Sequence, residues 1–271
     1  MIEITNFSKY YGKHLGVKDI SFTVNKGEIY GFIGQNGAGK TTTIRALLNL
    51  IFKTNGSLKI AGLDVEKETK QIKSFTSYVP SEVEYYQGSR VSDIFNLSKS
   101  LTTRNVDVDK LCKYFDLDQN RFIKELSLGN KKKVSLIQAL IKNPQVIILD
   151  EPTSGLDPII QERLFTLLKQ KQKEGLTVFL SSHNLREVEK YCDKVLIVKN
   201  GEVIDVFDLN EKRKTTSLKV IYKEKNKPTK TIITEENVNT IINNLARKDL
   251  ESIEILKPSL EEEFMKYYQE D

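Results

Sequence analysis

The feature that most constrains this chain is a run of glycines in GFIGQNGAGKTTTIRALL, residues 31–48. Glycine inside a helix or strand costs about 0.5–1 kcal/mol relative to alanine, so the bare backbone must serve a local purpose. The spacing Gly34-x4-Gly39-Lys40-Thr41 is that of a phosphate-binding loop, with a strand pattern before it and a helix pattern after it. The sequence therefore predicts a strand–loop–helix unit that binds phosphate. An ordinary glycine-rich turn is the less favoured alternative.

Each part of this loop has a chemical role in the prediction. Successive backbone N–H groups of a curled glycine loop converge on one spot, and the N-terminus of the following helix adds partial positive charge. Lys40 would hold the β- and γ-phosphates, and the Thr41 hydroxyl would ligate Mg²⁺. The predicted nucleotide-binding residues of this segment are Gly34, Asn36, Gly37, Ala38, Gly39, Lys40, Thr41 and Thr42.

Composition and charge limit where such a chain can work. It has 271 residues, 39% hydrophobic and 29% charged, which is normal for a soluble globular protein. Its apolar runs are far shorter than the roughly 18 residues of a membrane span, and MIEITNFSKYYGKH lacks the apolar core of a secretory signal. The isolated thiols Cys112 and Cys192 fit a reducing cytoplasm. A dispersed net charge of +5 would not hold the chain on a membrane or on nucleic acid, so membrane attachment would need a protein partner.

The residue pattern divides the chain into an α/β region, a helical insertion and a C-terminal part. Short strands are predicted within residues 2–33, and helical periodicity takes over at about residues 82–143. The segment QVIILD, residues 145–150, reads as a strand buried in a parallel sheet, and strands alternate with helices from there to about residue 207. From residue 208 a polar linker, LNEKRKTTS, leads to a small unit predicted as β-β-α-β-α.

Two carboxylates end the apolar strand. Asp150 and Glu151 follow VIIL, and in this architecture the carboxyl end of a parallel strand lies beside the phosphate loop. Asp150 would hold Mg²⁺, through water, and Glu151 would polarise an attacking water. A plain acidic strand end is the alternative, and the phosphate loop upstream makes it less favoured.

Four segments together resemble one family. They are GQNGAGKTT, LSLGN at residues 126–130, VIILDEPTSGLD, and SSH ending at His183. In order and spacing they are similar to the ATP-binding subunits of ABC transporters over residues 2–207. The resemblance implies an α/β phosphate-loop NTPase core with an N-terminal antiparallel β subdomain and a helical insertion, about residues 82–143. A small α+β extension after a linker, residues 208–271, would complete the chain.

The resemblance also implies how ATP and Mg²⁺ would be held. Two such subunits would pair head to tail, with each ATP between one subunit's glycine loop and the other's LSLGN. Ser127 and the N–H of Gly129 would contact the partner's γ-phosphate at a helix N-terminus. His183 would position the γ-phosphate and the water, and Asp157 would line the dimer interface. Tyr11, an aromatic before a glycine, would stack on adenine, with surface packing as the alternative.

The chain departs from the family pattern at several positions. Leu128 and Asn130 replace Gly and Gln in the usual Leu-Ser-Gly-Gly-Gln. Ser81 stands where the family carries a Gln that senses Mg²⁺ and the permease, and the neighbouring Glu82 is a substitute for that role or a solvated acid. The lysines at 131–133 are expected on a solvated helix face, and the tyrosines at 85–86 only at the surface or in a turn.

The sequence therefore favours the ATP-hydrolysing motor subunit of an exporter. A separate membrane permease would anchor it to the inner face of the cell membrane, with a short permease helix in a groove between the core and the helical insertion. The second subunit would be identical or a sister chain. A soluble ABC-type ATPase acting on the ribosome or DNA is the runner-up, although the single glycine loop and the lack of long heptads speak against it. A binding-only regulator is less favoured because Lys40, Glu151 and His183 are intact.

Overall fold

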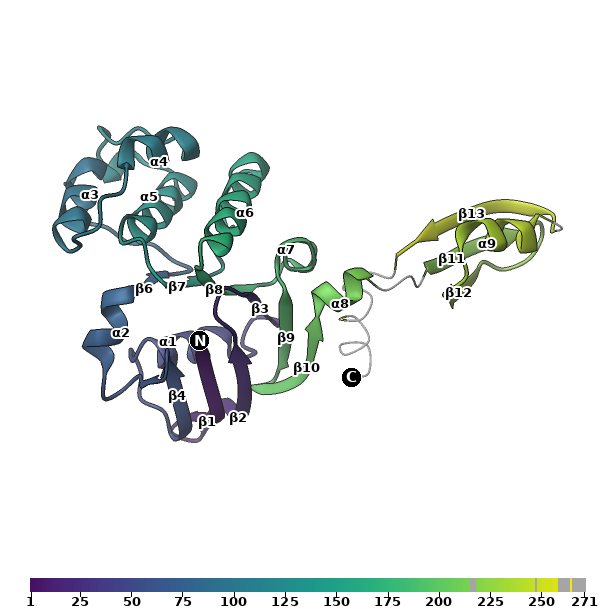
Figure 1. Ribbon diagram of the computed structural model, residues 1–271, viewed down its shortest axis with the longest axis horizontal. Coiled ribbons are helices and arrows are strands. Elements are labelled where there is room, and N and C mark those ends of the chain that lie inside the picture. The colour runs from purple at the N-terminus through teal and green to yellow at the C-terminus, as the bar shows by residue number, and fades with distance from the viewer. Residues whose placement is uncertain (215–217, 247, 258–263, 265–271) are drawn as a thin grey trace. The chain divides into compact units, whose positions relative to one another are not determined.

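Figure 1 shows a computed structural model of the chain, which is divided into two consecutive compact units. The structure describes residues 1–214, 218–246, 248–257 and 264. The first unit contains residues 1–207, and the second contains residues 208–271.

A six-stranded sheet forms the centre of the first unit, in the order β10-β9-β3-β8-β7-β6. The neighbouring pairs from β9 to β6 are parallel, so the carboxyl ends of these strands meet at one edge. Every residue of β3, β7 and β8 is buried, as expected for strands covered on both faces. The strands are β3 (Ile29–Ile33), β6 (Thr76–Val79), β7 (Val146–Asp150), β8 (Thr177–Ser182), β9 (Lys194–Lys199) and β10 (Glu202–Asp208).

A second, antiparallel sheet carries the N-terminus. It contains β1 (Ile2–Tyr11), β2 (His14–Val24), β4 (Asn55–Ile60) and β5 (Leu63–Asp64), in the order β2-β1-β4-β5. Its apolar side shares one core with the central sheet. The Phe22 ring stacks on Tyr30 and Phe179 with centroid distances of 5.6 and 5.7 Å, respectively. These findings confirm the predicted α/β fold with an antiparallel β subdomain.

Four helices lie beside the central sheet; three of them follow its strands β3, β7 and β8, and α2 follows β5 of the antiparallel sheet. They are α1 (Lys40–Leu47), α2 (Thr69–Phe75), α6 (Pro158–Lys173) and α7 (Leu185–Tyr191). Asp157 is the N-cap of α6, and its carboxylate accepts a 3.0 Å hydrogen bond from the Ile160 N–H. The Phe165 ring of α6 stacks on Tyr191 of α7 at 4.3 Å. Among the described residues, no helix is both long enough and apolar enough to cross a membrane.

Helices fill the segment between β6 and β7. They are α3 (Val91–Ser100), α4 (Val108–Phe115), the 3-10 turn η1 (Ile123–Glu125) and α5 (Leu128–Ile141). The middle helix, α5, contacts α3, α4 and β6, and most of its side chains are buried. The expectation that the lysines at 131–133 form a solvated face is wrong for Lys132 and Lys133, which are 2% and 8% exposed. Because α5 is covered on several sides, the ammonium groups of these two lysines meet backbone carbonyls rather than water.

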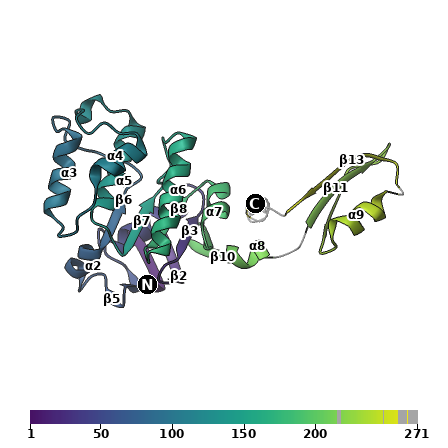
Figure 2. The ribbon, with the colours of Figure 1, turned by 45° about the horizontal axis from the view of Figure 1, so that its top comes forward.

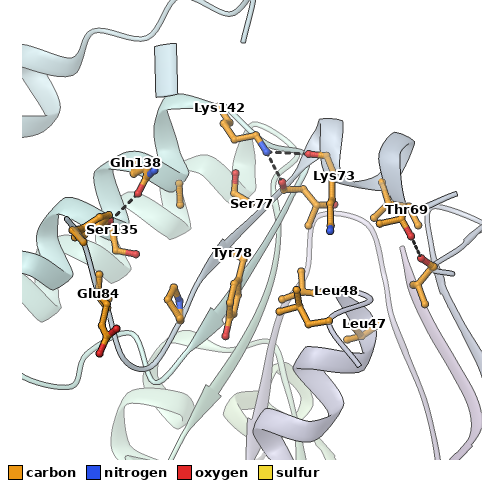
Figure 3. Close-up of a pocket in the computed structure, with 18 residues that line it drawn as sticks. Leu47, Leu48, Thr69, Lys73, Ser77, Tyr78, Glu84, Ser135, Gln138 and Lys142 are labelled. Carbon is orange, nitrogen blue, oxygen red and sulfur yellow. Dashed lines mark hydrogen bonds between the residues drawn. The ribbon is translucent and has the colours of Figure 1, made fainter. Parts of the chain in front are cut away.

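A groove with a volume of about 410 Å³ lies between α5 on one side and α1 and α2 on the other (Figure 3). Apolar residues of α1 and α2, among them Leu47 and Ile72, line one side. Tyr85, expected only at the surface or in a turn, lines the other side and donates a 2.8 Å hydrogen bond to Gln138 of α5. The Lys142 ammonium donates to the carbonyls of Lys73 and Thr76 at 2.9 and 3.0 Å.

The second unit is a small sheet covered by one helix. Its strands β11 (Leu218–Glu224), β12 (Lys230–Thr234) and β13 (Leu250–Leu256) pair in the order β12-β11-β13, and both pairs are antiparallel. Figure 2 shows α9 (Val238–Leu245) lying along this sheet. Within the described part of the unit, the buried core residues are Val220, Tyr222, Ile241 and Leu245.

The C-terminal part of the chain differs from the sequence expectation at the predicted linker, and its predicted last helix lies mostly outside the described residues. The segment expected as a linker begins with a short helix, α8 (Leu209–Lys214). The Asp208 carboxylate accepts hydrogen bonds from the N–H groups of Asn210 and Glu211, at 3.0 and 3.1 Å, and so starts the helix. The final helix of the predicted β-β-α-β-α unit falls almost wholly outside the described residues.

Candidate functional site

The glycine loop joins β3 to α1, and two of its glycines are required by close packing. A Cβ added to Gly34 would lie 2.4 Å from the carbonyl oxygen of Val198 on β9. A Cβ added to Gly39 would lie 2.4 Å from a methyl group of Val17, and Gly39 has a φ of +101°. The loop can therefore pass between β9 and β2 only with bare backbone at these positions. Gly39 is also the N-cap residue of α1, so the N-terminus of α1 opens directly at the loop.

Lys40 extends back across the loop that precedes it. Its side chain is only 7% exposed, and its ammonium donates to the carbonyl oxygens of Gly34 and Gln35 at 2.6 and 3.2 Å. The same nitrogen lies 3.6 Å from a carboxylate oxygen of Glu151. A buried ammonium is costly unless it is paired, and here carbonyls and a carboxylate hold it at the mouth of the loop.

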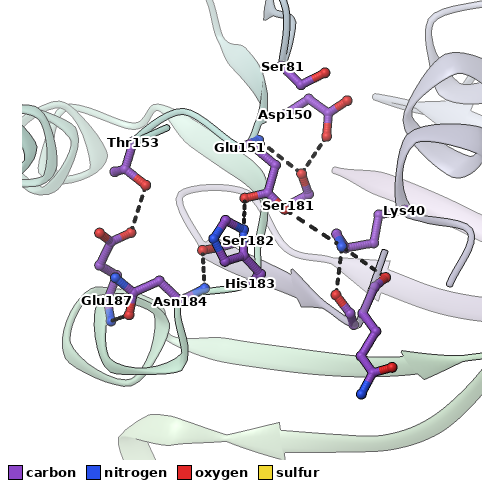
Figure 4. Close-up of polar contacts among 12 residues, drawn as sticks. Lys40, Ser81, Asp150, Glu151, Thr153, Ser181, Ser182, His183, Asn184 and Glu187 are labelled. Atoms are coloured by element: carbon purple, nitrogen blue, oxygen red, sulfur yellow. Dashed lines mark hydrogen bonds and ion pairs between the residues drawn. The ribbon is translucent and has the colours of Figure 1, made fainter. Parts of the chain in front are cut away.

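Asp150 lies at the carboxyl end of β7, beside the start of α1 (Figure 4). It is 1% exposed, and its two carboxylate oxygens accept hydrogen bonds from different elements. The Ser181 hydroxyl of β8 donates to one at 2.6 Å, and the Thr41 hydroxyl of α1 donates to the other at 3.1 Å. Sequence reasoning did not single out Ser181. The parallel register places it there, because Asp150 pairs with Ser181 across β7 and β8.

Glu151 turns away from the strand in a left-handed backbone conformation, with a φ of 48°. Non-glycine residues adopt this region at a cost of about 1–3 kcal/mol. The N–H of Glu151 donates to the Ser181 hydroxyl at 3.1 Å, which helps hold this conformation. One carboxylate oxygen lies 2.7 Å from His183 Nδ1, as Figure 4 shows. The side chain of Glu151 is 17% exposed and that of His183 is 69% exposed, so both reach the surface of the cleft.

Glu151 and His183 border an open cleft of about 710 Å³. Its lining comes from the glycine loop, the segment after β6, the end of β7 and the segment after β8. The lining residues are Gln35, Asn36, Ser81, Glu82, Glu151, Ser154 and His183. The structure thus brings Asn36, Glu151 and His183 together, with Ser81 and Glu82 on the same cleft.

The cleft offers oxygen donors rather than a ready-made metal cage. Among the described residues no group of at least three His, Cys, Asp or Glu side chains could hold a metal ion. The Thr41 hydroxyl and the Asp150 carboxylate, in mutual contact at 3.1 Å, are hard oxygen ligands. Mg²⁺ prefers one or two such protein oxygens together with waters and phosphate oxygens. The donor set therefore fits Mg²⁺ bound with a nucleotide.

Tyr11 ends β1 and is 45% exposed. The Lys9 ammonium lies 5.0 Å from the centre of its ring. A Cβ placed on Gly16 would lie 3.0 Å from the Tyr11 ring and 3.3 Å from the Thr42 methyl group. The ring is thus near the first turn of α1, and adenine stacking stays a prediction.

Ser127 and Gly129 lie at the start of α5. Ser127 is the N-cap of the helix, and its hydroxyl accepts a 3.3 Å hydrogen bond from the Asn130 N–H. A Cβ on Gly129 would lie 2.4 Å from the Gly155 carbonyl oxygen. Leu128 is 63% exposed. Neither Ser127 nor Gly129 is among the described residues that line the cleft, and phosphate binding by them stays a prediction.

Two charged groups near the cleft, one buried and one half-buried, were not anticipated from the sequence. The Lys132 ammonium donates to the carbonyl oxygens of Pro80, Ser81 and Asp150. Burial lowers the pKa of Lys132 to about 8, although the charges of Asp150 and Glu151 act in the opposite direction. A lysine within a basic run gives no sequence signal of burial, because such runs are usually solvated.

The second unanticipated group is Glu187 on α7. Its carboxylate accepts a 3.0 Å hydrogen bond from the Thr153 hydroxyl, two residues after Glu151. The other oxygen of Glu187 is buried and has no hydrogen-bond partner among the described residues. Burial raises the pKa of this carboxyl, and hydrogen bonds from Thr153 and Asn184 partly oppose the shift.

Comparisons with known proteins agree with this geometry. Residues 17–154 match the family described as ABC transporter. An uncharacterised ABC transporter ATP-binding protein of Methanocaldococcus jannaschii is 35% identical, and the match covers 75% of this chain and 76% of that protein. The bacitracin transport ATP-binding protein BcrA of Bacillus licheniformis is 34% identical over 84% of this chain and 76% of its own length.

A solved structure described as the ATP-binding subunit of an ABC transporter is 28% identical, with a TM-score of 0.73. The match covers 79% of this chain and 92% of that one. The chain therefore belongs to the ABC transporter family, as an ATP-binding subunit that hydrolyses ATP. The names of these three proteins refer to transporters, which favours this function over the soluble ribosome- or DNA-acting alternative.

Proposed function

We propose that this chain is the ATP-hydrolysing subunit of an exporter whose membrane-spanning permease is a separate protein. The observation that carries the proposal is the set of contacts that join Lys40 to Glu151, Thr41 to Asp150 and Glu151 to His183, beside a cleft that Glu151 and His183 line. ABC ATP-binding subunits work with permease components and as pairs. The cytoplasmic face of the membrane is the corresponding location for this chain.

Within the cleft each residue has a distinct task. Lys40 would exchange its bonds to the loop carbonyls for the β- and γ-phosphates of ATP, because it already lies at the mouth of the loop. Thr41 and Asp150 would hold Mg²⁺, Asp150 through water. When bound there, Mg²⁺ neutralises charge on the phosphate oxygens. Asn36 and Thr42 stand at the two ends of the segment 36–42, whose backbone N–H groups would bind the phosphate oxygens.

Glu151 would orient the attacking water and accept its proton. Its carboxylate borders the open cleft and is held by His183 at 2.7 Å, so one oxygen is fixed while the group faces solvent. General-base catalysis requires such a group within hydrogen-bond reach of the water. His183, which is more exposed, would contact the γ-phosphate and keep Glu151 in position.

A second subunit would complete the site. Ser127 and Gly129 open the N-terminus of α5, where backbone N–H groups favour an anion. Because they lie outside the cleft of their own chain, they fit a contact with the nucleotide of a facing subunit. Asp157 is the N-cap of α6 and lies two residues after Gly155, which packs against Gly129. Asp157 would line the contact between the subunits.

The permease would be engaged at the groove of Figure 3. Its floor is apolar at Leu47 and Ile72, and Glu84 and Lys73 supply charges of both signs along it. This chemistry suits a short amphipathic helix. Export, rather than import, is proposed from the sequence resemblance to the ATPases of exporters, and the chain is also similar to a bacitracin transport protein over most of its length.

The central test is Glu151→Gln, which removes the proposed base while keeping a hydrogen-bonding group of the same size. We expect this variant to bind ATP, to turn it over at least about 100-fold more slowly, and to form a stable pair of subunits. Light scattering and single-turnover hydrolysis measure the two effects. A variant that hydrolyses ATP at the wild-type rate would remove Glu151 from the mechanism.

The permease proposal has its own measurement. The chain, purified from membranes under mild conditions, is expected to bring an integral membrane protein with it. Substituting Ile72→Glu in the floor of the groove is expected to abolish this co-purification while ATP binding persists. Tight binding of the purified chain to protein-free liposomes would contradict the proposal, because attachment would then not need a permease.

A further inference from the structure

Lys132 connects three elements through one buried ammonium. It lies near the start of α5 and is 2% exposed. Its nitrogen donates to the carbonyl oxygens of Pro80 at 2.7 Å, Ser81 at 3.0 Å and Asp150 at 3.4 Å. An ammonium has three donors, and all three have a carbonyl acceptor here. Pro80 and Ser81 follow β6, and Asp150 ends β7, so the contact joins α5 to the carboxyl edge of the central sheet.

The neighbouring lysines show that this contact is specific to position 132. Lys133 is also buried, at 8% exposure, but its ammonium donates to the Asp116 carbonyl at 3.2 Å. Asp116 is the C-cap of α4, so Lys133 joins two helices of the same segment. Lys131 is only half-buried. Of these three lysines, Lys132 alone has described hydrogen bonds to the core.

The acceptors of Lys132 lie where the candidate site and the helical segment meet. The segment 80–82 leads from β6 into the helices, and Ser81 and Glu82 line the cleft. The Asp150 carbonyl belongs to the peptide bond that leads into Glu151, whose backbone is held in the left-handed conformation. A bond to Ser81 through its carbonyl does not depend on the side chain at that position. The short serine side chain is therefore compatible with a firmly held segment.

We propose that Lys132 is a positioning residue that fixes residues 80–81 and the 150–151 peptide to α5. Through this contact a movement of α5 relative to the core changes the placement of Glu151 in its own chain. Burying an ammonium is unfavourable without such compensation, which is why an apolar residue would be expected if packing alone mattered. The inference rests on the proposed function only where it concerns hydrolysis, since the contact itself exists without nucleotide.

The test compares Lys132→Met with the matched control Lys133→Met in the full chain. Both variants replace an ammonium on α5 by an apolar chain of similar length. Without nucleotide, amide hydrogen exchange of residues 81–85 is expected to rise in Lys132→Met and to stay at the wild-type level in Lys133→Met. With Mg·ATP, kcat is expected to fall about tenfold or more in Lys132→Met, with a smaller change in KM. Lys133→Met is expected to keep kcat within about twofold of wild type.

Lys132→Arg, which keeps the charge and the donors, is expected to recover most of the protection and of kcat. If Lys132→Met does not fold, Lys132→Gln replaces it in the same comparison. Equal exchange of residues 81–85 in the position-132 and position-133 variants would overturn the proposal, because general loosening of α5 would explain both. A position-132 variant that folds and keeps the wild-type kcat and exchange would also overturn it. Neither result would change the Glu151→Gln outcome, so the two proposals fail separately.

Discussion

At the scale of single residues, buried charges shape the surroundings of the cleft. Lys40 and Lys132 both donate hydrogen bonds to backbone carbonyls. Lys40 donates to Gly34 in the glycine loop, and Lys132 of α5 donates to Asp150. The Asp150 carboxylate takes hydroxyl donors instead, from Thr41 and Ser181. Each charge is thus compensated by neighbours that different elements supply, as burial requires.

Glu187 is the exception, because one of its oxygens is buried without a described partner. Its pKa is raised by burial, so the folded protein holds this proton more tightly than the unfolded chain does. The carboxyl therefore stabilises the fold less as pH rises from its ordinary value toward the raised one. We expect the free energy of unfolding of Glu187→Gln, relative to that of wild type, to be higher at about pH 7 than at about pH 4. Urea unfolding of both proteins at the two pH values measures this difference in stability.

The control for this prediction is Glu84→Gln, which removes an exposed carboxylate of the same type. Its stability relative to wild type is expected to vary little over the same pH range. If the free energy of unfolding of Glu187→Gln minus that of wild type stays constant or falls as pH rises, the charged form of Glu187 is not destabilised in the fold.

At the scale of elements, the start of α5 depends on a contact between backbones. Gly129 approaches the Gly155 carbonyl so closely that a Cβ would lie 2.4 Å from the oxygen. Gly155 itself has a φ of +76° and belongs to the turn between β7 and α6. The LSLGN segment, residues 126–130, and the segment after Glu151 therefore pack against each other within one chain.

Gly129→Ala tests this contact. Because the clash is with backbone, no side-chain rotation can relieve it, and a shift of α5 or of the turn must follow. We expect a loss of about 1–3 kcal/mol in the free energy of unfolding, measured by urea denaturation. Asn130→Ala, at the next position of the helix, is expected to change stability by less than about 1 kcal/mol. Equal losses in the two variants would mean that α5 tolerates a Cβ at position 129.

At the scale of the whole molecule, the two compact units have separate cores. The large core joins the two sheets of residues 1–207. Among the described residues, the core of the second unit comes from β11, β13 and α9, with four buried side chains. So small a core rarely sustains a fold alone, whereas the first unit contains every residue of the candidate cleft.

We therefore expect residues 1–214 alone to fold cooperatively and to bind Mg·ATP with an affinity within about fivefold of the full chain. Isothermal titration calorimetry with ATP measures the affinity, and thermal unfolding measures the cooperativity. The chain with Lys40→Ala, which lacks the ammonium of the glycine loop, is the control for specific binding and should show no tight ATP binding. A truncated chain that is folded but does not bind ATP would show that the second unit contributes to the site.

The sequence by itself determined the elements whose residues are contiguous. The glycine loop, the acidic end of β7 and the family are readable because their residues lie a few positions apart, where local backbone geometry decides the outcome. The parallel sheet followed from the continuous apolar strands. Adenine stacking by Tyr11 and phosphate binding by Ser127 stay predictions.

Only the tertiary structure decided which distant residues meet. Ser181 reaches Asp150 because β7 and β8 are neighbours in a particular register. Lys132 is buried because α5 docks against β6 and the neighbouring helices, although a basic run by itself predicts exposure. Strand order and helix docking follow from the packing of the whole core, and no short window of sequence encodes that packing.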